Sequence, residues 1–243
     1  MKKELATMDF AAGELVLLDK PAGWTSFALV TQLKKWTHAK VGHAGTLDPL
    51  ASGLMICCTG KWTKKLGDLT GLQKSYDATI KLGAVTPTYD RESLPEQMQP
   101  VPAFTESDLE KVFTNFRGTI RQYPPVHSAV KLDGTPAYEL ARKGKEVAVK
   151  ERTIQIYSLE RLACREDELD IRVTCSSGTY IRSLAHDIGQ ALGCGAYLHT
   201  LQRTSIGPHL LTEAWTLDEL QTHFGSLIRT RLILPKNRQA YEA

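Results

Sequence analysis

The stretch from Gly42 to Gly53, GHAGTLDPLASG, is the part of the sequence that most constrains the fold. Its glycines allow backbone conformations that other residues resist, and Pro49 disfavours the α region for Asp48 immediately before it. The apolar run 54–58 follows at once and predicts a buried strand. We therefore expect a carboxylate held on a rigid loop at the entrance to that strand. A structural role fits the same pattern, because an Asp followed by Pro is also a common cap of a short helical turn.

Composition excludes several classes of protein. The 243 residues are enough to bury a full core, and no apolar run approaches the ~18 residues of a membrane span. The N-terminal residues form no continuous apolar signal region, so we expect a cytoplasmic protein. The five cysteines are odd in number and include no Cys-x-x-Cys pair. This pattern argues against a disulfide scaffold and against a zinc site.

The order of the predicted elements indicates an α+β fold. Strands are predicted at 15–18, 54–58, 76–82, 153–159 and 169–175. Helices are predicted at 63–72 and 107–116, from Ser26 through Leu33, and after Thr179 with Tyr180 and Arg182 in the first turn. Ser26 is the expected N-cap of the first helix. Strands and helices mix without a regular βαβ order, which favours antiparallel strand pairing. No internal repeat is present, and we expect a single domain over residues 1–243.

The excess positive charge of the chain gathers in a basic segment at about 117–152. This segment holds eight Lys or Arg against four Asp or Glu, a net charge of +4, whereas the whole chain carries +3. Basic side chains interleaved with Tyr123, His127 and Tyr138 suit a phosphate backbone with stacked bases. A solvated charged surface fits the same composition, so charge alone leaves both interpretations open.

Arg182 stands at an unusual place in a predicted helix. It falls in the first turn, where the helix dipole disfavours a cation, and it lies off the apolar stripe of that helix. We infer that Arg182 has a specific partner, for which a buried carboxylate is an obvious candidate. The alternative is an ordinary surface arginine.

Three separated motifs resemble those of the TruB family of tRNA pseudouridine synthases. Lys20-Pro21-x-Gly23-x-Thr25-Ser26 is similar to the first motif, the Gly42–Gly53 stretch to the catalytic motif, and Ser177-Gly178-Thr179-Tyr180-Ile181-Arg182 to the third. Tyr76, the run Tyr123-Pro124-Pro125-x-x-Ser128-Ala129-x-Lys131 and Leu201-x-Arg203-Thr204 also fall where the family has them. The resemblance covers about residues 13 to 212.

The resemblance implies the pseudouridine-synthase fold, an α+β fold with a central mixed, mainly antiparallel sheet, flanking helices and an active-site cleft. It also implies a reaction on uridine 55 in the T-loop of tRNA. The glycosidic bond is cut, the uracil rotates, and C5 is joined to C1′ to give pseudouridine. No cofactor and no metal ion are implied. The expected partner is the T-arm of tRNA, with no membrane, no protein partner and a monomeric state.

The resemblance also assigns roles to residues. Asp48 is the essential catalyst, which either attacks C1′ covalently or removes a sugar proton on the way to a glycal. The expected substrate-binding residues are His43, Tyr76, Tyr180, Arg182 and Leu201, with Arg182 as the hypothesised partner that keeps Asp48 ionised. The expected contacts with the RNA backbone, all within the basic segment, are Arg142, Lys143, Lys145 and Lys150.

The sequence departs from the family pattern at three points. Family members often carry a C-terminal PUA-type RNA-binding domain, but only 31 residues follow Thr212, so we expect no PUA domain. His127 stands where Phe or Tyr is expected, and Ser93 where Gly is usual. Two rival functions fit parts of the same sequence, a tRNA-binding folding chaperone and a base-releasing nucleic-acid glycosidase. A glycosidase would use a similar carboxylate, but base release changes the mass of the RNA and isomerisation does not.

Overall fold

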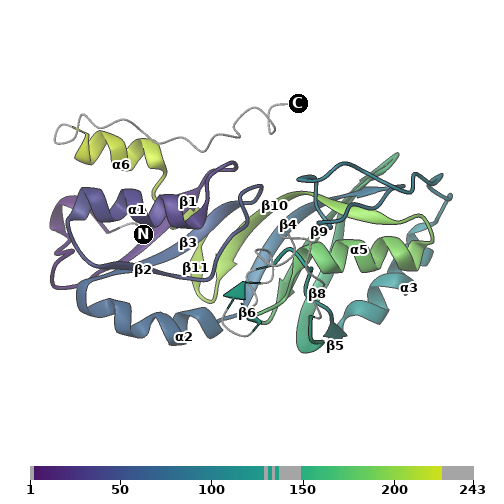
Figure 1. The fold of residues 1–243 in the computed structure, drawn as a ribbon, viewed down its shortest axis with the longest axis horizontal. Coiled ribbons are helices and arrows are strands. Elements are labelled where there is room, and N and C mark those ends of the chain that lie inside the picture. Colours follow the sequence, from purple (N-terminus) through teal and green to yellow (C-terminus); the bar gives the residue numbers. More distant parts are fainter. Residues whose placement is uncertain (1–2, 129–130, 133–134, 137–148, 226–243) are drawn as a thin grey trace. The chain divides into compact units, whose positions relative to one another are not determined.

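The computed structural model describes residues 3–128, 131–132, 135–136 and 149–225, which fall into two compact units. The first unit takes its described residues from Met1–Tyr76 and Leu201–Ala243, and the second unit lies within Asp77–Thr200. Strands β4 (Lys74–Leu82) and β10 (Ala196–Ile206), both labelled in Figure 1, have residues in both units. Within the described ranges, every helix is too short or too polar to span a membrane.

The sheet of the first unit is built around strand β3 (Ser52–Thr59). Strands β1 (Leu15–Lys20) and β2 (Val41–Ala44) pair with β3 in antiparallel register, and the last part of β10 pairs with it in parallel. The short strand β11 (His209–Leu210) returns antiparallel to β10. Because β3 is buried along almost its whole length, its sequence is a continuous apolar run rather than an alternating one.

Three helices and three 3-10 turns complete the described part of the first unit. The helices are α1 (Ser26–Thr37), α2 (Leu66–Gly71) and α6 (Leu217–Phe224), and the turns are η1 (Leu5–Thr7), η2 (Gly60–Lys65) and η3 (Leu211–Glu213). The predicted helix at 63–72 is therefore divided between η2 and α2. Helix α6 lies against α1, where the rings of Trp36 and Phe224 stack with centroids 5.7 Å apart.

Thr25 is the N-cap of α1, so the prediction of Ser26 as the cap is wrong by one residue. The Thr25 hydroxyl accepts a hydrogen bond from the Ala28 N–H at 3.0 Å. The hydroxyl of Ser26 is bound instead to the backbone of Leu47, which lies in a different loop. Of two adjacent hydroxyls, one therefore begins the helix and the other holds the loop that contains Asp48.

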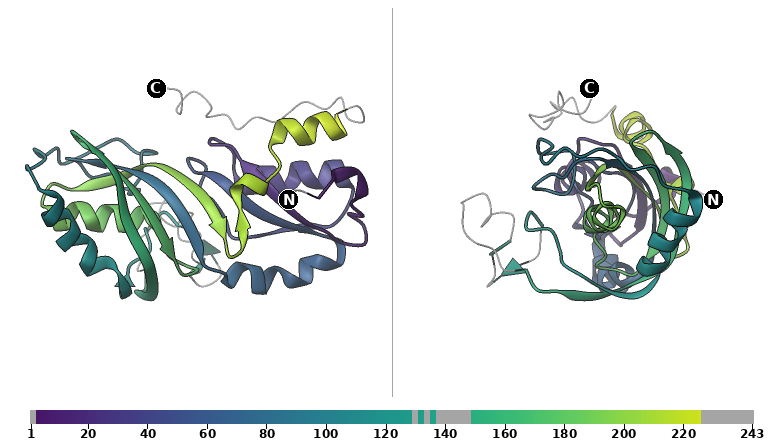
Figure 2. Two further views of the ribbon diagram at one scale, coloured as in Figure 1. Left: turned by 180° about the vertical axis from the view of Figure 1, so that it is seen from behind. Right: turned by 90° about the vertical axis from the view of Figure 1, so that its right-hand side faces the viewer.

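In the second unit the strand order is β10-β4-β9-β8-β5. Strand β8 (Arg152–Arg165) pairs antiparallel with both β9 (Glu168–Cys175) and β5 (Gly118–Gln122). Helices α3 (Glu106–Phe116) and α5 (Ile181–Leu192) contact each other, and α3 also contacts β8 (Figure 2). The strands β6 (Lys131–Leu132) and β7 (Thr135–Pro136) form a separate two-stranded ladder.

The core of the second unit lies between these helices and strands. Leu109 and Phe113 of α3 and Leu184 and Ile188 of α5 are buried, as the helical spacing of the apolar residues predicts. The β3–β10 pair is parallel, whereas the pairs of β3 with β1 and β2, of β8 with β5 and β9, and of β10 with β11 are antiparallel. This mixed, mainly antiparallel pairing with flanking helices confirms the α+β class. The single-domain division remains a prediction.

Candidate active site

The loop that carries Asp48 connects β2 to β3 in the first unit. Because His43 pairs with Cys57 and Ala44 with Ile56, the two ends of the loop are fixed by one antiparallel ladder. The Ala51 N–H donates to the Asp48 carbonyl at 3.1 Å, so Asp48 is the first residue of a tight turn with Pro49 next, not the cap of a helix.

Asp48 itself is half-buried, between two residues whose side chains anchor the loop. Leu47 and Leu50 are 4% and 2% exposed. Their burial fixes the loop backbone on both sides of Asp48 while leaving its carboxylate partly accessible. The expectation of a carboxylate on a rigid loop at the entrance to a buried strand is met.

Ser26 holds the loop through the backbone immediately before Asp48. Its hydroxyl donates to the Leu47 carbonyl and accepts from the Leu47 N–H, both at 2.9 Å. Ser26 is 4% exposed, so these hydrogen bonds are shielded from water. One side chain therefore satisfies both backbone groups of the residue that precedes the carboxylate.

Lys20 holds the loop through the backbone immediately after Asp48. Its ammonium group is fully buried and donates to the carbonyl oxygens of Trp24 at 2.6 Å, Pro21 at 3.0 Å and Pro49 at 3.4 Å. The Gly23 N–H donates to the same Pro49 carbonyl at 2.8 Å. The first sequence motif therefore supports the Asp48 loop directly.

Arg203 is a third support, which belongs to a family motif but is not among the predicted site residues. It is 1% exposed, and its guanidinium donates to the carbonyls of Leu54 at 2.7 Å and Gly45 at 3.1 Å. Its backbone pairs with Gly53, whose φ is +103° and where an added Cβ would lie 2.4 Å from the Arg203 carbonyl oxygen. Only glycine fits there, so the last glycine of the stretch allows β3 and β10 to approach closely.

Three predicted substrate-binding residues lie with Asp48 in the first unit. His43 is half-buried on β2, whereas Tyr76 on β4 and Leu201 on β10 are each 7% exposed. Burial lowers the pKa of His43, and the charge of Arg203 lowers it further, against a backbone hydrogen bond with Gly45. His43 is therefore a neutral ring at neutral pH, which suits stacking against a base.

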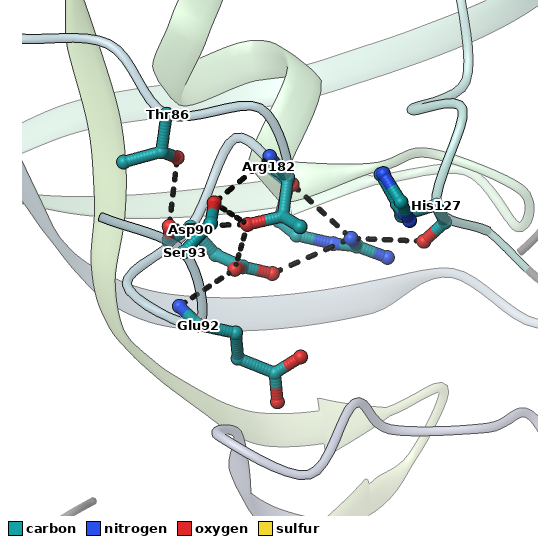
Figure 3. Close-up of polar contacts among 7 residues, drawn as sticks. Thr86, Asp90, Glu92, Ser93, His127 and Arg182 are labelled. Atoms are coloured by element: carbon teal, nitrogen blue, oxygen red, sulfur yellow. Dashed lines mark hydrogen bonds and ion pairs between the residues drawn. The ribbon is translucent and has the colours of Figure 1, made fainter. Parts of the chain in front are cut away.

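Arg182 and Tyr180 lie in the second unit, at the start of α5. Arg182 is 6% exposed, forms an ion pair with Asp90 at 3.3 Å and donates to the His127 carbonyl at 3.1 Å (Figure 3). It also donates to the Thr88 carbonyl at 3.2 Å. The inferred buried carboxylate partner is thus present, because Asp90 is 1% exposed. The pairing of Arg182 with Asp48 remains a prediction.

Asp90 is held by the short turn around it. The Thr88 hydroxyl and the Glu92 N–H donate to one Asp90 carboxylate oxygen at 2.6 and 2.9 Å. Ser93, which stands where the family usually has Gly, adds a contact between its hydroxyl and that of Thr88 at 2.7 Å and accepts from the Thr88 N–H at 3.2 Å. This departure from the pattern therefore strengthens the turn.

Gln122 fixes the backbone of Tyr180, a role that the sequence did not reveal. The side-chain amide of Gln122 accepts from the Tyr180 N–H at 2.9 Å and donates to its carbonyl at 3.1 Å. The guanidinium of Arg152 lies 5.6 Å from the centroid of the Tyr180 ring. Gln122 is 1% exposed at the end of β5. Its role could be inferred from the sequence only if the position of that strand end beside α5 were also given.

A family model described as TruB family pseudouridylate synthase (N terminal domain) matches residues 33–181. The chain belongs to the TruB family. A second model, the tRNA pseudouridylate synthase B C-terminal domain, matches residues 182–235. The tRNA pseudouridine synthase B of Parabacteroides distasonis is 49% identical over 220 residues, covering 88% of this chain and 94% of the relative. That of Opitutus terrae is 43% identical, covering 90% and 91%.

Solved structures support the same family fold. A chain of a Cbf5-Nop10-Gar1 complex has 33% identity and a TM-score of 0.67, and one of an archaeal box H/ACA sRNP Nop10-Cbf5 complex has 28% and 0.64. They cover 86% and 88% of this TruB-family chain, which spans about half of their length, 53% and 54%. The likeness confirms the expected pseudouridine-synthase fold.

The structure describes only part of the basic segment predicted to grip RNA. Lys150 is exposed, whereas Arg142, Lys143 and Lys145 lie outside the described residues. Arg117 is paired with Glu110 and Arg121 with Glu151, so these two charges have acidic partners. Among the described residues of this TruB-family chain, no cluster of three or more His, Cys, Asp or Glu could hold a metal ion.

Proposed function

We propose that this chain isomerises uridine in tRNA to pseudouridine, with Asp48 as the catalytic carboxylate. Membership of the TruB family supports the reaction. The observation that carries the role of Asp48 is its loop, whose backbone is bound by Ser26 before the carboxylate, by Lys20 after it and by Arg203 at Gly45. A carboxylate held in this way keeps its geometry while the substrate is rearranged, which favours a reaction at a sugar carbon.

The proposed chemistry begins with a uridine flipped out of its RNA loop. Asp48 then attacks C1′ as positive charge develops there and the N1–C1′ bond breaks, or it removes a sugar proton so that the same bond breaks and a glycal forms. After the uracil has rotated, C5 bonds to C1′ and loses its proton, N1 gains a proton, and Asp48 returns to its starting state. Atoms balance because the product is an isomer of the substrate.

We assign the remaining predicted residues to binding the flipped base. The neutral ring of His43 stacks into the RNA loop that the uridine leaves, and Tyr76 stacks on the uracil. We assign Tyr180 and Leu201 to contacts with the uracil, and Arg182 to supplying positive charge. The exposed Lys150, with Arg142, Lys143 and Lys145, contacts the RNA backbone.

The finer parts of the proposal concern the substrate and the working state. We propose uridine 55 in the T-arm of tRNA as the target, acted on by a monomer without a protein partner. We also propose that the protein works in the cytoplasm, where tRNA is found. The cysteines of the described residues are free, as expected for a reducing compartment.

Tritium release tests the proposal. The tRNA is labelled at C5 of uracil, and the native chain is compared with Asp48→Asn, which is nearly the same size but carries no negative charge. We expect tritium release and an unchanged RNA mass with the native chain, and no release with Asp48→Asn at undiminished tRNA binding. Turnover by Asp48→Asn would remove Asp48 from the chemistry. A loss of uracil from the RNA would indicate a base-releasing glycosidase, and tRNA refolding without tritium release a chaperone.

A further inference from the structure

Two side chains on one face of α5 contact three consecutive residues of a neighbouring turn, residues 88–90. Arg182 and His186 are four residues apart, so their side chains lie on the same face of the helix. Arg182 contacts Thr88 and Asp90, and the ring of His186 stacks on the ring of Tyr89, with centroids 4.0 Å apart and planes inclined by 13°. Two side chains of one helical turn therefore bind residues 88, 89 and 90.

Tyr89 has a backbone conformation that aromatic residues rarely adopt. Its φ of +60° lies in the left-handed region. The Tyr89 N–H donates to the Thr86 carbonyl at 3.1 Å, and its own carbonyl accepts from the Leu198 N–H at 3.0 Å. Tyr89 lies between Thr88, whose carbonyl accepts from Arg182, and Asp90, whose carboxylate pairs with Arg182. Its conformation therefore determines where that carbonyl and that carboxylate point.

His186 contributes to this arrangement through the face of its ring. Its Nδ1 is buried and has no hydrogen-bond partner among the residues that the structure describes. Burial lowers the pKa of His186, so the imidazole is neutral at neutral pH. A neutral imidazole packs on the Tyr89 ring without bringing a second positive charge next to Arg182.

We propose that the Tyr89–His186 stack is a positioning device for Arg182, which fixes the turn at 88–90 on α5 and so holds the Asp90 carboxylate against the guanidinium. The inference rests on the proposed function, in which Arg182 acts on the substrate. Tyr89 and His186 are positioning residues in this scheme, because they act through Arg182 and Asp90. Neither was identified from the sequence.

Single-turnover kinetics on C5-labelled tRNA test the proposal with four variants. His186→Ala removes the stack, whereas His186→Phe keeps an aromatic face of similar size. Tyr89→Asn removes the other ring but tolerates the left-handed conformation. Tyr157→Asn removes an exposed tyrosine on β8 and is the matched control. The affinity for tRNA is measured separately, so that effects on binding and on the rate are distinguished.

We expect His186→Ala and Tyr89→Asn to lower the single-turnover rate by about 3- to 10-fold, the range expected for one aromatic pair. The affinity for tRNA stays within about twofold, His186→Phe regains most of the native rate, and Tyr157→Asn has the native rate. A native rate in His186→Ala, or a rate in His186→Phe as low as in His186→Ala, overturns the proposal.

Amide hydrogen exchange gives a readout that does not depend on activity. The Leu198 N–H donates to the Tyr89 carbonyl, so its exchange reports how firmly the turn is held. We expect faster exchange at Leu198 in His186→Ala than in the native chain, and native exchange in His186→Phe. If the native chain forms no pseudouridine, the proposed function fails, while exchange at Leu198 still decides whether the stack fixes the turn.

Discussion

The Ser26 hydroxyl and the Leu47 backbone exchange two hydrogen bonds, one in each direction and both 2.9 Å long. Ser26 begins α1, and Leu47 immediately precedes Asp48 in the loop between β2 and β3. The first sequence motif therefore determines the conformation of the second, and the position of the carboxylate depends on a hydroxyl that lies 21 residues before Leu47 in the chain. This dependence can be measured.

Replacing Ser26 by Ala is expected to lower both stability and activity. The Leu47 N–H and carbonyl lose their partner in a buried position, which costs about 1–3 kcal/mol of unfolding free energy. The rate of pseudouridine formation falls because the loop is less well fixed, while tRNA affinity changes little. Thr25→Ala is the matched control, since loss of this cap costs ~1 kcal/mol but leaves the loop bound. Equal losses of activity in the two variants would contradict the role of Ser26.

Gly53→Ala is expected to be among the most damaging small substitutions in the chain. The φ of Gly53 is +103°, and the new Cβ would lie 2.4 Å from the Arg203 carbonyl oxygen. We expect a loss of roughly 3 kcal/mol or more in urea unfolding, because the strands must separate or the backbone must change. Gly67→Ala is the control, since its Cβ meets no atom within 4 Å and a helical alanine is favoured. A stable Gly53→Ala protein would show that β3 and β10 do not require this close approach.

Asp90→Asn is expected to destabilise the second unit strongly. Asp90 and Arg182 have side chains only 1% and 6% exposed, and removal of one partner leaves the other charge buried. Breaking such a pair costs about 3–5 kcal/mol. Asp77→Asn provides the comparison, because Asp77 and Arg172 form a pair that is partly exposed to solvent, for which ~1 kcal/mol or less is expected. Similar losses in urea unfolding for the two variants would show that the Arg182 charge is compensated in another way.

The sequence predicts the Asp48 loop well because its signals are local. Pro49 and the glycines restrict the backbone wherever they occur, and the apolar run after them reads directly as a buried strand. Asp48, His43 and Tyr76 could be named on this basis and on the family motifs. The α+β class follows from the same kind of local pattern.

The supports of the site could not be predicted because their partners are distant in the chain. Arg203 meets the Gly45 carbonyl across 158 residues, and Gln122 meets Tyr180 across 58. The place of Arg182 in the first turn of a helix made a carboxylate partner an obvious candidate, but no spacing rule selects Asp90 among the acidic residues of the chain. The partner that each of these side chains finds depends on how the strands are ordered in the sheet.

Asp187 is expected to make stability depend on pH between about 3.8 and 6. Burial raises its pKa from 3.8 to about 6. The folded state therefore keeps a proton that the unfolded state has lost, and stability falls as pH rises through this window. Above about pH 6 the loss of unfolding free energy stays constant, on the order of 1 kcal/mol once solvent screening is considered.

Asp187→Asn removes this loss. The free energy of unfolding of the variant, measured in urea, therefore exceeds that of the native chain by an amount that grows from pH 3.8 to 6 and then levels off. Both proteins keep His186, whose lowered pKa destabilises the fold below its ordinary value of 6.5, and this contribution cancels in the difference. Asp68→Asn, at an exposed position on α2, is the control. An advantage that does not change with pH would contradict the raised pKa of Asp187.

Neutralising the basic segment is expected to flatten the salt dependence of tRNA binding. Each lysine that contacts a phosphate releases counterions when it binds, which contributes up to about 0.9 to the slope of log affinity against log salt. Changing Lys143, Lys145 and Lys150 to Gln should therefore lower the slope by up to about 2.7, with the rate at saturating tRNA unchanged. Lys111→Gln is the control, because Lys111 is exposed but already paired with Asp108 at 3.1 Å. An unchanged slope would mean that this segment is a solvated surface and that RNA is bound elsewhere.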